Sequence, residues 1–308
     1  MAVTLMLTPQ IGWLTTPIEA ASEGYAIVVE IAQPAPVPGV ASSGVPRTYS
    51  SALPVTDAIA LGELAKEHVA AASPVRLLNM FDKSAHLYDL AYSFKNYGAE
   101  SAWVRNAIHA RVPQARSLLD VACGTGKHLE HLRDEFDCQG LDLNPEFVEL
   151  AQQRTGVKVH GASMDSFDLD EKFDAVVCLF SSIGYTSDLS GAICSMARHL
   201  NPGGVLIVEP WLRPDQWAAG QVQVLDQAAD GIRLVRMTTS WVDGSQSILD
   251  MHYLVASPSG IEHLVETHRM TLFTLAEYEA AFLASDLTFE FDQEGPTGRG
   301  VLIGLASY

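Results

Sequence analysis

The sequence predicts an α/β protein built on a doubly wound, mostly parallel sheet with an antiparallel insert. From about residue 80, short apolar runs bounded by Gly, Asp or Pro alternate with segments of helical periodicity, as in repeated βαβ units. The first of these runs ends in a glycine-rich loop, and after the fifth the pattern changes to the two-residue alternation of antiparallel strands. A chain of 308 residues is long enough for one large domain of this kind.

The buried parallel strands and the helices around them follow from the apolar runs and the segments between them. Strands are expected at 116–121, 138–142, 157–160, 173–179 and 203–209. Helices are expected at 98–112, 126–136, 145–154 and 188–200.

The antiparallel insert is predicted after the fifth strand, over about residues 212–272. Alternating segments within 221–257 are divided by Asp243 and Gly244, a pair typical of a tight hairpin. A helix at 274–285 and strands near 287–292 and 299–305 follow, which brings the main sheet to seven strands.

The first 79 residues differ in composition from the rest of the chain. Their only basic residues are Arg47, Lys66 and Arg76, and a stretch rich in Pro, Gly and Ser separates an expected strand at 25–31 from an expected helix at 57–72. We therefore predict that residues 1–79 form a low-complexity extension, disordered or upstream of a true start at Met80. Residues 80–308 are the predicted domain.

Charge and composition narrow the class of protein. There are 19 Lys and Arg against 37 Asp and Glu, and the net charge of −18 disfavours binding to nucleic acid. No apolar run is long enough to span a membrane, and no basic segment resembling a secretory signal is present. The four cysteines have no CxxC spacing. These features predict a cytoplasmic protein that acts on a small molecule.

The glycine-rich loop at 120–126, with the sequence DVACGTG, is the strongest local signal. Its glycines let the backbone pass close to a ligand, and the helix that follows offers free N–H groups to an anionic group. A dinucleotide-binding loop would carry a third glycine where Leu129 stands, and a P-loop would continue into Gly-Lys-Ser or Gly-Lys-Thr. A dehydrogenase is therefore disfavoured.

Three further loops follow successive predicted strands. Asp142 ends the second strand and can accept both ribose hydroxyls of an adenosine. Ser163 and Met164 follow the third strand, and residues 180–185, with the sequence FSSIGY, follow the fourth. The carboxyl ends of parallel strands share one edge of the sheet, so these loops are expected to converge on one crevice.

With these motifs the sequence resembles the class I S-adenosylmethionine-dependent methyltransferases, and within them the N,N-dimethyltransferases of dTDP-linked amino sugars of the desosamine and mycaminose type. The resemblance covers about residues 80–305. It is carried in order by LYDLAY, KNY, SLLDVACGTGKHLEHL, GLDLN, FSSIGY, HLNPGGVLIVEPW, THRMTLFT, EYEAAF and GPTGRG.

The resemblance implies S-adenosylmethionine as cofactor and N-methylation of a nucleotide-linked amino sugar. Position by position, it assigns cofactor binding to Tyr88, Tyr97, Asp120, Ala122, Gly124, Gly126, Asp142, Ser163, Met164 and Leu179. Asp142 would hold the ribose, and Ser163 and Met164 would flank the adenine. On the acceptor side it implies Tyr185 as an orienting residue with a modest acid/base role, together with Ser182, Trp211 and Arg299, the last near the nucleotide diphosphate.

Departures from the family pattern keep alternatives open. Ser163 stands where the family has Asp, and Val242 and Ile248 stand where relatives often have arginines. A methyltransferase acting on O or N of another small metabolite and a non-catalytic cofactor-binding accessory subunit are the alternatives. The histidines show no metal-ligand spacing, so no metal is expected, and His128 and His131 are predicted to face solvent. A homodimer is a further expectation of the resemblance.

Overall fold

The computed structural model describes residues 2–5, 14–17, 76–78 and 85–307. The chain divides into two compact units, Met1–Pro74 and Val75–Tyr308. In the first unit, β1 (Ala2–Leu5) pairs antiparallel with β2 (Leu14–Pro17). The strand predicted at 25–31 and the helix predicted at 57–72 lie outside the described residues.

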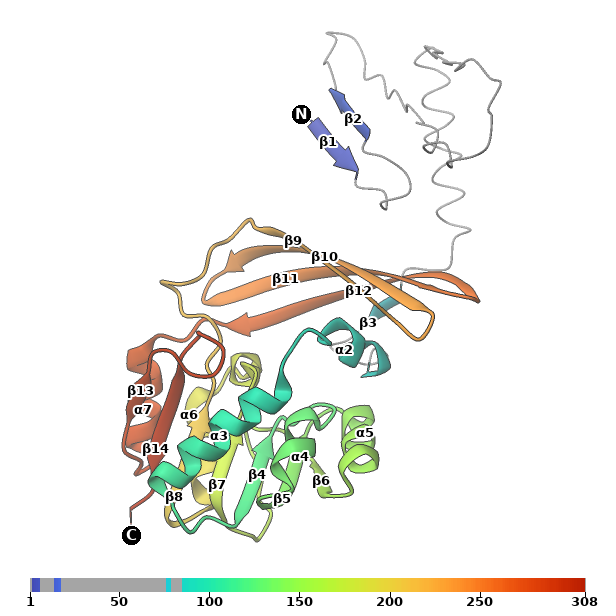
Figure 1. The fold of residues 1–308 in the computed structure, drawn as a ribbon. Coiled ribbons are helices and arrows are strands. Elements are labelled where there is room, and N and C mark those ends of the chain that lie inside the picture. The colour runs from blue at the N-terminus through green and yellow to red at the C-terminus, as the bar shows by residue number, and fades with distance from the viewer. Residues whose placement is uncertain (1, 6–13, 18–75, 79–84, 308) are drawn as a thin grey trace, which may run out of the picture. The chain divides into compact units, whose positions relative to one another are not determined.

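The second unit contains a seven-stranded sheet in the order β13-β14-β8-β7-β4-β5-β6 (Figure 1). The five strands from β8 to β6 run parallel, whereas β14 is antiparallel to both β8 and β13. Their bounds are β4 (Ser117–Val121), β5 (Asp137–Asp142), β6 (Lys158–Gly161), β7 (Phe173–Cys178), β8 (Leu200–Val208), β13 (Glu290–Asp292) and β14 (Val301–Leu305).

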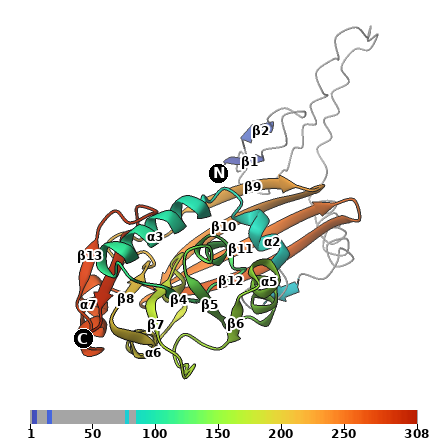
Figure 2. The same ribbon diagram turned by 60° about the horizontal axis from the view of Figure 1, so that its bottom comes forward.

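Helices cover both faces of this sheet, as Figure 2 shows for α3 and α6 on opposite sides of the strands. One apolar core lies between the sheet and α6 (Leu189–Arg198) with α7 (Leu275–Ala284). The other lies between the sheet and α3 (Tyr97–Arg111), α4 (Lys127–Leu132) and α5 (Pro145–Thr155). Because both faces are covered, the central strands are buried along nearly their whole length, which explains their continuous apolar runs.

A second sheet is built largely from the insert. Its order is β3-β12-β11-β10-β9, with β9 (Val222–Ala229), β10 (Ile232–Asp243), β11 (Gln246–Ser257) and β12 (Gly260–Thr271) antiparallel to one another. The predicted hairpin is present, since Asp243 pairs with Gln246 across a tight turn. At the edge, β3 (Arg76–Leu78) pairs parallel with β12, just upstream of the domain boundary predicted at Met80.

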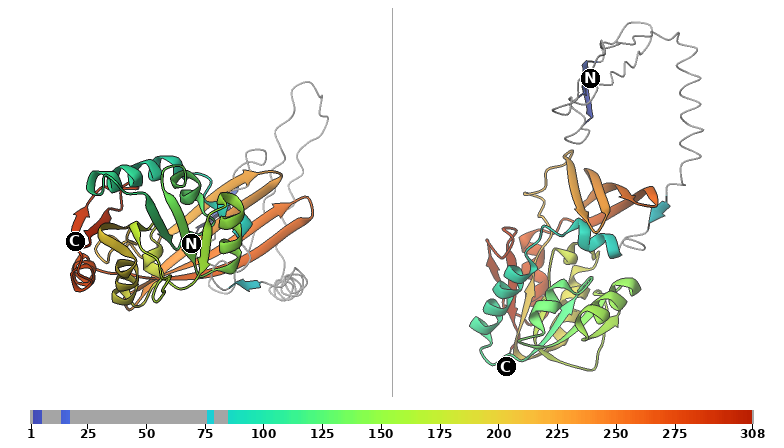
Figure 3. Two further views of the ribbon diagram at one scale, coloured as in Figure 1. Left: turned by 90° about the horizontal axis from the view of Figure 1, so that it is seen from below. Right: turned by 45° about the vertical axis from the view of Figure 1, so that its right-hand side comes forward.

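The insert sheet lies over the carboxyl ends of the parallel strands, and Figure 3 shows this from two further sides. A third apolar cluster joins it to α2 (Ala85–Ala91) and to the short helix η1 (Ser182–Tyr185). The predicted fold class is therefore confirmed: a doubly wound, mostly parallel sheet of seven strands with an antiparallel insert after the fifth parallel strand.

Most predicted boundaries agree with the structure to within a few residues because capping residues set them. Asn144 caps α5 with Pro145 in its first turn, and Thr274 forms a capping box with Glu277 at the start of α7. The helix predicted at 126–136 is an exception, since α4 ends at Leu132. Phe136 is buried in the core, so the chain must turn there before it enters β5. Among the described residues, no helix is long and apolar enough to cross a membrane.

Candidate active site

The glycine loop after β4 has a left-handed backbone at three alternate positions. Ala122, Gly124 and Gly126 have φ values of 58°, 56° and 77°. No described atom lies within 4 Å of a Cβ built on Gly124, which therefore borders open space. A Cβ on Gly126 would instead lie 3.0 Å from the Cβ of Ala151, so Gly126 allows α4 to approach α5. Ala122 adopts a conformation that alanine rarely takes, and such strain is concentrated at functional sites.

Asp142, at the end of β5, is held in place by backbone N–H groups. Its Oδ2 accepts a hydrogen bond from the Gly124 N–H at 2.8 Å, and its Oδ1 accepts one from the Asn144 N–H at 2.9 Å. Burial raises the pKa of this carboxyl, although the N–H donors oppose the rise. The carboxylate is therefore fixed beside the glycine loop, at the edge where the sequence predicted a ribose contact.

Asp120 is a buried polar group of the site whose hydrogen bonds are not all satisfied among the described residues. It is buried, and its Oδ2 has no hydrogen-bond partner among the described residues. Burial, followed by the charge of Asp142, raises the pKa of Asp120 to about 8. The side chain borders a small cavity of about 30 Å³ that Tyr97, Thr125 and Leu179 also line. A buried carboxyl facing such a cavity is suited to a cationic ligand group.

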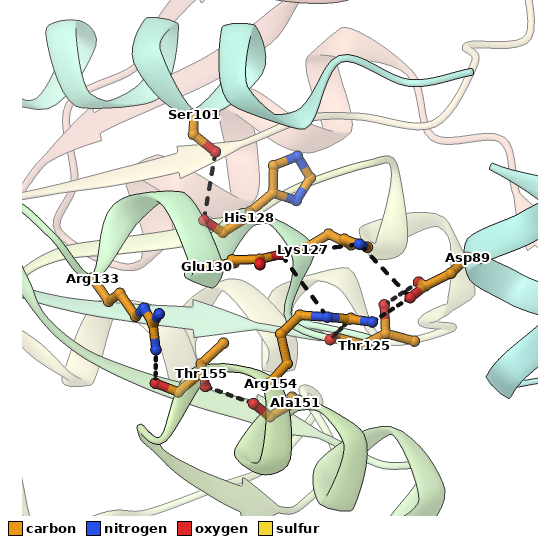
Figure 4. Close-up of polar contacts among 10 residues, drawn as sticks. All are labelled: Asp89, Ser101, Thr125, Lys127, His128, Glu130, Arg133, Ala151, Arg154 and Thr155. Atoms are coloured by element: carbon orange, nitrogen blue, oxygen red, sulfur yellow. Dashed lines mark hydrogen bonds and ion pairs between the residues drawn. The ribbon is translucent and has the colours of Figure 1, made fainter. Parts of the chain in front are cut away.

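The helix α2 carries Tyr88 over the glycine loop and is fastened there by a polar cluster (Figure 4). The Thr125 hydroxyl donates to Asp89 Oδ1 at 2.7 Å. Arg154, from α5, donates to both Asp89 and the carbonyl of Thr125. This cluster therefore joins three segments that are far apart in the sequence, and Asp89 is its common acceptor.

A large cavity of about 870 Å³ extends from these loops to the insert sheet. Its volume lies in the upper part of the usual range for small-molecule sites. Five residues border both this cavity and the small one, which makes the two neighbours: Tyr88, Ala122, Gly124, Phe180 and Ser182. The other predicted residues that line the large cavity are Asp142, Ser163, Met164, Tyr185, Trp211 and Arg299. Gly126 is the predicted residue placed elsewhere, in the contact with α5.

The turn between β7 and η1 is strained and is held by a buried carboxylate. Phe180 and Ser181 have φ values of 51° and 62°. Glu209, which follows β8, accepts from the Phe180 N–H at 2.7 Å and from the Thr297 hydroxyl at 2.5 Å. Arg299 donates to the Ser181 hydroxyl at 2.9 Å and lies 4.0 Å from Glu209. Glu209 thus links the turn to the C-terminal loop that carries Arg299.

Tyr185 contacts the insert sheet through a buried histidine. Its hydroxyl lies 2.7 Å from Nδ1 of His268, whose Nε2 lies 3.2 Å from Oε2 of Glu266. His268 and Glu266 are each 1% exposed, and His268 lines the cavity beside Tyr185. Arg236 of β10 reaches the same cavity and donates to the Tyr92 hydroxyl at 3.2 Å, while its Nε has no hydrogen-bond partner among the described residues.

Several of these residues were missed in the sequence, for different reasons. Arg236 and His268 lie in the alternating strands of the insert, where the pattern shows two faces but not which face meets a cavity. The sequence therefore gives Arg236 no role and leaves open whether His268 faces the core or lines the acceptor pocket. Glu209 directly follows an apolar strand, and a carboxyl residue at the end of a buried strand is the signal that identifies it. The prediction that His128 faces solvent is wrong: it is buried and bonds Glu100 at 2.9 Å, because α3 packs over it, whereas His131 is exposed.

The residues present fit S-adenosylmethionine. The unpaired Asp120 carboxyl suits the cationic end of an amino acid, and the Asp142 carboxylate suits vicinal hydroxyls. Aromatic rings of Tyr88 and Phe180 border both cavities, and such rings attract a sulfonium. Sheet order, glycine loop and cavity together define a class I S-adenosylmethionine-dependent methyltransferase.

Comparison with known proteins gives the same class. A protein-family model described as a methyltransferase domain matches residues 118–204. The chain is 43% identical over 229 residues to dTDP-3-amino-3,4,6-trideoxy-alpha-D-glucopyranose N,N-dimethyltransferase of Streptomyces venezuelae, which covers 72% of this chain and 97% of that protein. It is 42% identical to dTDP-3-amino-3,6-dideoxy-alpha-D-glucopyranose N,N-dimethyltransferase of Streptomyces fradiae, over 72% of this chain and 90% of that one.

Solved structures agree with the sequence relatives. The crystal structure of Streptomyces venezuelae DesVI matches with a TM-score of 0.71 and 41% identity, over 73% of this chain and 99% of that one. The structure of an S-adenosylmethionine-bound amino pentose methyltransferase from Micromonospora echinaspora matches with a TM-score of 0.67 and 35% identity, over 72% of this chain and 97% of that one. The chain belongs to the family of dTDP-amino-sugar N,N-dimethyltransferases. It is a S-adenosylmethionine-dependent methyltransferase, and the dehydrogenase and accessory-subunit alternatives are set aside.

Proposed function

We propose that this enzyme methylates the amino nitrogen of a nucleotide-linked amino sugar. The observation that carries the proposal is the large cavity, which runs from Asp142 on the cofactor side to Arg236 and Arg299 on the other. The chain has a net charge of −18, so two arginines in one cavity are a local exception suited to an anionic acceptor such as a nucleotide diphosphate. The two Streptomyces relatives are N,N-dimethyltransferases of dTDP-linked amino sugars, which are substrates of this kind.

The cofactor side is assigned by position around the two cavities. Asp142 binds the ribose hydroxyls, Ser163 and Met164 flank the adenine, and Asp120 faces the amino-acid end. The backbone around Ala122 and Gly124, the rings of Tyr88 and Tyr97, and Leu179 enclose that end. Gly126 acts through the packing of α4. The Ser163 hydroxyl accepts from the Asp165 N–H at 3.2 Å, so it shapes its own turn as well as bordering the cavity.

The acceptor side has a smaller set of residues. Tyr185 stands beside the acceptor amine, and Arg299 binds the diphosphate. Trp211, whose indole N–H donates to the Ser247 hydroxyl at 2.8 Å, is fixed as a wall of the acceptor pocket. Ser182 borders both cavities and so lies near the point where the two ligands meet.

The mechanism is mainly positioning. S-adenosylmethionine supplies a methyl group on a sulfonium that is already activated toward an amine nucleophile. The protein holds the amine in line with that methyl group and excludes water, and such orientation is worth on the order of 7–11 kcal/mol. The hydroxyl of Tyr185 accepts a hydrogen bond from the amine and so aims its lone pair.

The proposal also covers the role of residues 1–79, the cellular location and the oligomeric state. Residues 1–79 contribute nothing to catalysis. The enzyme works in the cytoplasm as a homodimer. Sedimentation of the full chain and of a chain that begins at Val75, which retains β3, tests both the extension and the dimer.

The experiment that tests the substrate class is calorimetric titration with S-adenosylhomocysteine, followed by dTDP in its presence. Both ligands are expected to bind. Arg299→Met is expected to weaken dTDP by about tenfold, the value of a charged hydrogen bond, and to leave S-adenosylhomocysteine unchanged. Arg233→Met is the matched control, because Arg233 is exposed and pairs with Asp226 on the insert sheet. If S-adenosylhomocysteine binds and dTDP does not, the acceptor belongs to another class of metabolite.

A further inference from the structure

A chain of three hydrogen-bonded side chains leads from the acceptor end of the cavity into the protein. Tyr185 and His268 line the cavity, whereas Glu266 lies behind them. The contacts are 2.7 Å from the Tyr185 hydroxyl to His268 Nδ1 and 3.2 Å from His268 Nε2 to Glu266. Tyr185 belongs to η1, whereas Glu266 and His268 belong to β12, and 83 positions separate Tyr185 from His268 in the sequence.

The direction of these hydrogen bonds follows from what each group can donate. A carboxylate only accepts, so Nε2 of His268 carries the hydrogen that faces Glu266. In a neutral imidazole the other nitrogen is then an acceptor, so the Tyr185 hydroxyl donates to Nδ1. A phenol oxygen that donates one hydrogen bond can also accept one, so Tyr185 can both donate to His268 and accept from a donor in the cavity.

We propose that Tyr185, His268 and Glu266 form a proton relay that takes the proton released by the acceptor amine during methylation. The inference rests on the proposed function, because it requires an amine acceptor. Tyr185 is the catalytic residue that touches the amine, and His268 and Glu266 are positioning residues that act through it.

The step balances in atoms and charge. The amine lone pair forms the new N–C bond as the C–S bond breaks, and the electron pair of that bond stays on sulfur. The ammonium that results gives a proton to the Tyr185 oxygen while Tyr185 gives its own proton to His268 Nδ1. The imidazolium is paired with Glu266, and the extra proton returns through Tyr185 to water after the product leaves.

The surroundings favour transient rather than permanent storage of this proton. Among the described residues, the other titratable groups that face Tyr185 include Tyr88, Tyr92, Tyr253 and Arg236. Burial and the neighbouring phenols raise the pKa of Tyr185, so its hydroxyl stays protonated at rest and passes the proton on to His268. The arrival of the proton adds one positive charge to the cluster, and the Glu266 carboxylate compensates part of it.

The first test replaces His268 by a side chain that keeps the hydrogen bond but cannot hold the proton. His268→Asn places an amide oxygen near the position of Nδ1. Turnover is expected to fall about a hundredfold at pH 7, a typical value for general base catalysis, with the affinity for S-adenosylhomocysteine unchanged. Near pH 9.5 the deficit is expected to shrink to less than about fivefold, because hydroxide can then take the proton from the ammonium that methylation forms. Glu266→Gln is expected to show the same trend with a smaller loss.

Matched controls come from a second histidine–glutamate pair. His109 and Glu135 also lie 3.2 Å apart, at the surface and away from both cavities. His109→Asn and Glu135→Gln are expected to match the wild type at every pH. In a double-mutant cycle, Tyr185→Phe removes the entry to the relay, so adding His268→Asn should cause little further loss.

The outcomes separate the relay from the proposed function. If His268→Asn lost the same factor in turnover at all pH values, or kept full activity at pH 7, the relay would be overturned. The proposed function would still stand as long as the wild type methylates the amine. A wild type that methylates no amino sugar would overturn both. Nitrogen-15 NMR of labelled histidine gives a readout without turnover: the Nε2–H tautomer of His268 is expected, and the Nδ1–H tautomer would overturn the relay because it leaves the Tyr185 proton without an acceptor.

Discussion

The buried carboxyl of Asp120 makes cofactor binding depend on pH in a way that can be calculated. Burial and the charge of Asp142 raise its pKa to about 8 in the ligand-free protein, and its Oδ2 has no partner among the described residues. The α-ammonium group shared by S-adenosylmethionine and S-adenosylhomocysteine favours the ionised form. Binding must therefore release a proton whenever the pH is below about 8.

The magnitude follows from the size of this shift. At pH 7, a carboxyl of pKa about 8 is roughly nine-tenths protonated, so binding releases about 0.9 proton and costs about 1.4 kcal/mol relative to pH above 8. The affinity for S-adenosylhomocysteine is thus expected to rise about tenfold from pH 6 to pH 7, about fivefold from pH 7 to pH 8 and about twofold above pH 8, and then to level off.

Calorimetry in two buffers of different ionisation enthalpy measures both the affinity and the proton release. In Asp120→Asn both pH effects should vanish, while in Asp142→Asn the break should move to lower pH because one source of the raised pKa is gone. The ligand-free protein gives an independent check on the sign. A raised carboxyl pKa destabilises the folded protein as the pH rises from about 4 to about 8. The free energy of unfolding of Asp120→Asn should therefore increase relative to that of the wild type over this range. Affinity independent of pH, with no proton release, would refute the reasoning.

Two further substitutions test how the helix α2 and the glycine loop are held in position. Asp89→Asn removes the charge that fastens α2 to Thr125 and Arg154, so the affinity for S-adenosylhomocysteine should fall about fivefold in calorimetry, whereas Glu290→Gln at the remote pair with Arg111 should leave it unchanged. Gly126→Ala combines a φ of 77° with a Cβ 3.0 Å from Ala151 and should lower the free energy of unfolding by about 3 kcal/mol in urea titration. Gly156→Ala has a φ of 70° and no described atom within 4 Å, so about 1 kcal/mol is expected there, and a larger loss at Gly156 than at Gly126 would contradict the packing role.

The parallel sheet was predictable because each of its strands is a local signal. A strand buried on both faces is mostly apolar, and β4 and β7 contain such runs, whereas β5 is shorter in apolar residues and ends in the buried Leu141 and Asp142. Residues at the carboxyl ends of these strands, such as Asp120 and Asp142, could be grouped because parallel strands end on a common edge. The end of α4 could not be predicted, since it depends on where Phe136 enters the core.

The insert shows where local pattern stops being sufficient. Alternation along β10 and β12 predicts that one face of each strand is buried. It does not predict which residues Arg236 and His268 contact. Their roles depend on which strands, loops and helices the insert meets across the sheet edge, and Tyr185 and Tyr92 belong to segments distant in the sequence.

The sequence by itself determined the class of protein and the succession of its strands along the chain, and it grouped the residues that we expect on the cofactor side, because these depend on residues close together in the chain or on the shared edge of parallel strands. Only the tertiary structure showed three further features: the left-handed backbone of Ala122 in the glycine loop, the buried Glu209 behind the strained turn, and the contact of Tyr185 with His268. The physical reason is that hydrogen bonds and burial between distant segments exist only once the insert has packed over the parallel sheet, and no local pattern encodes them.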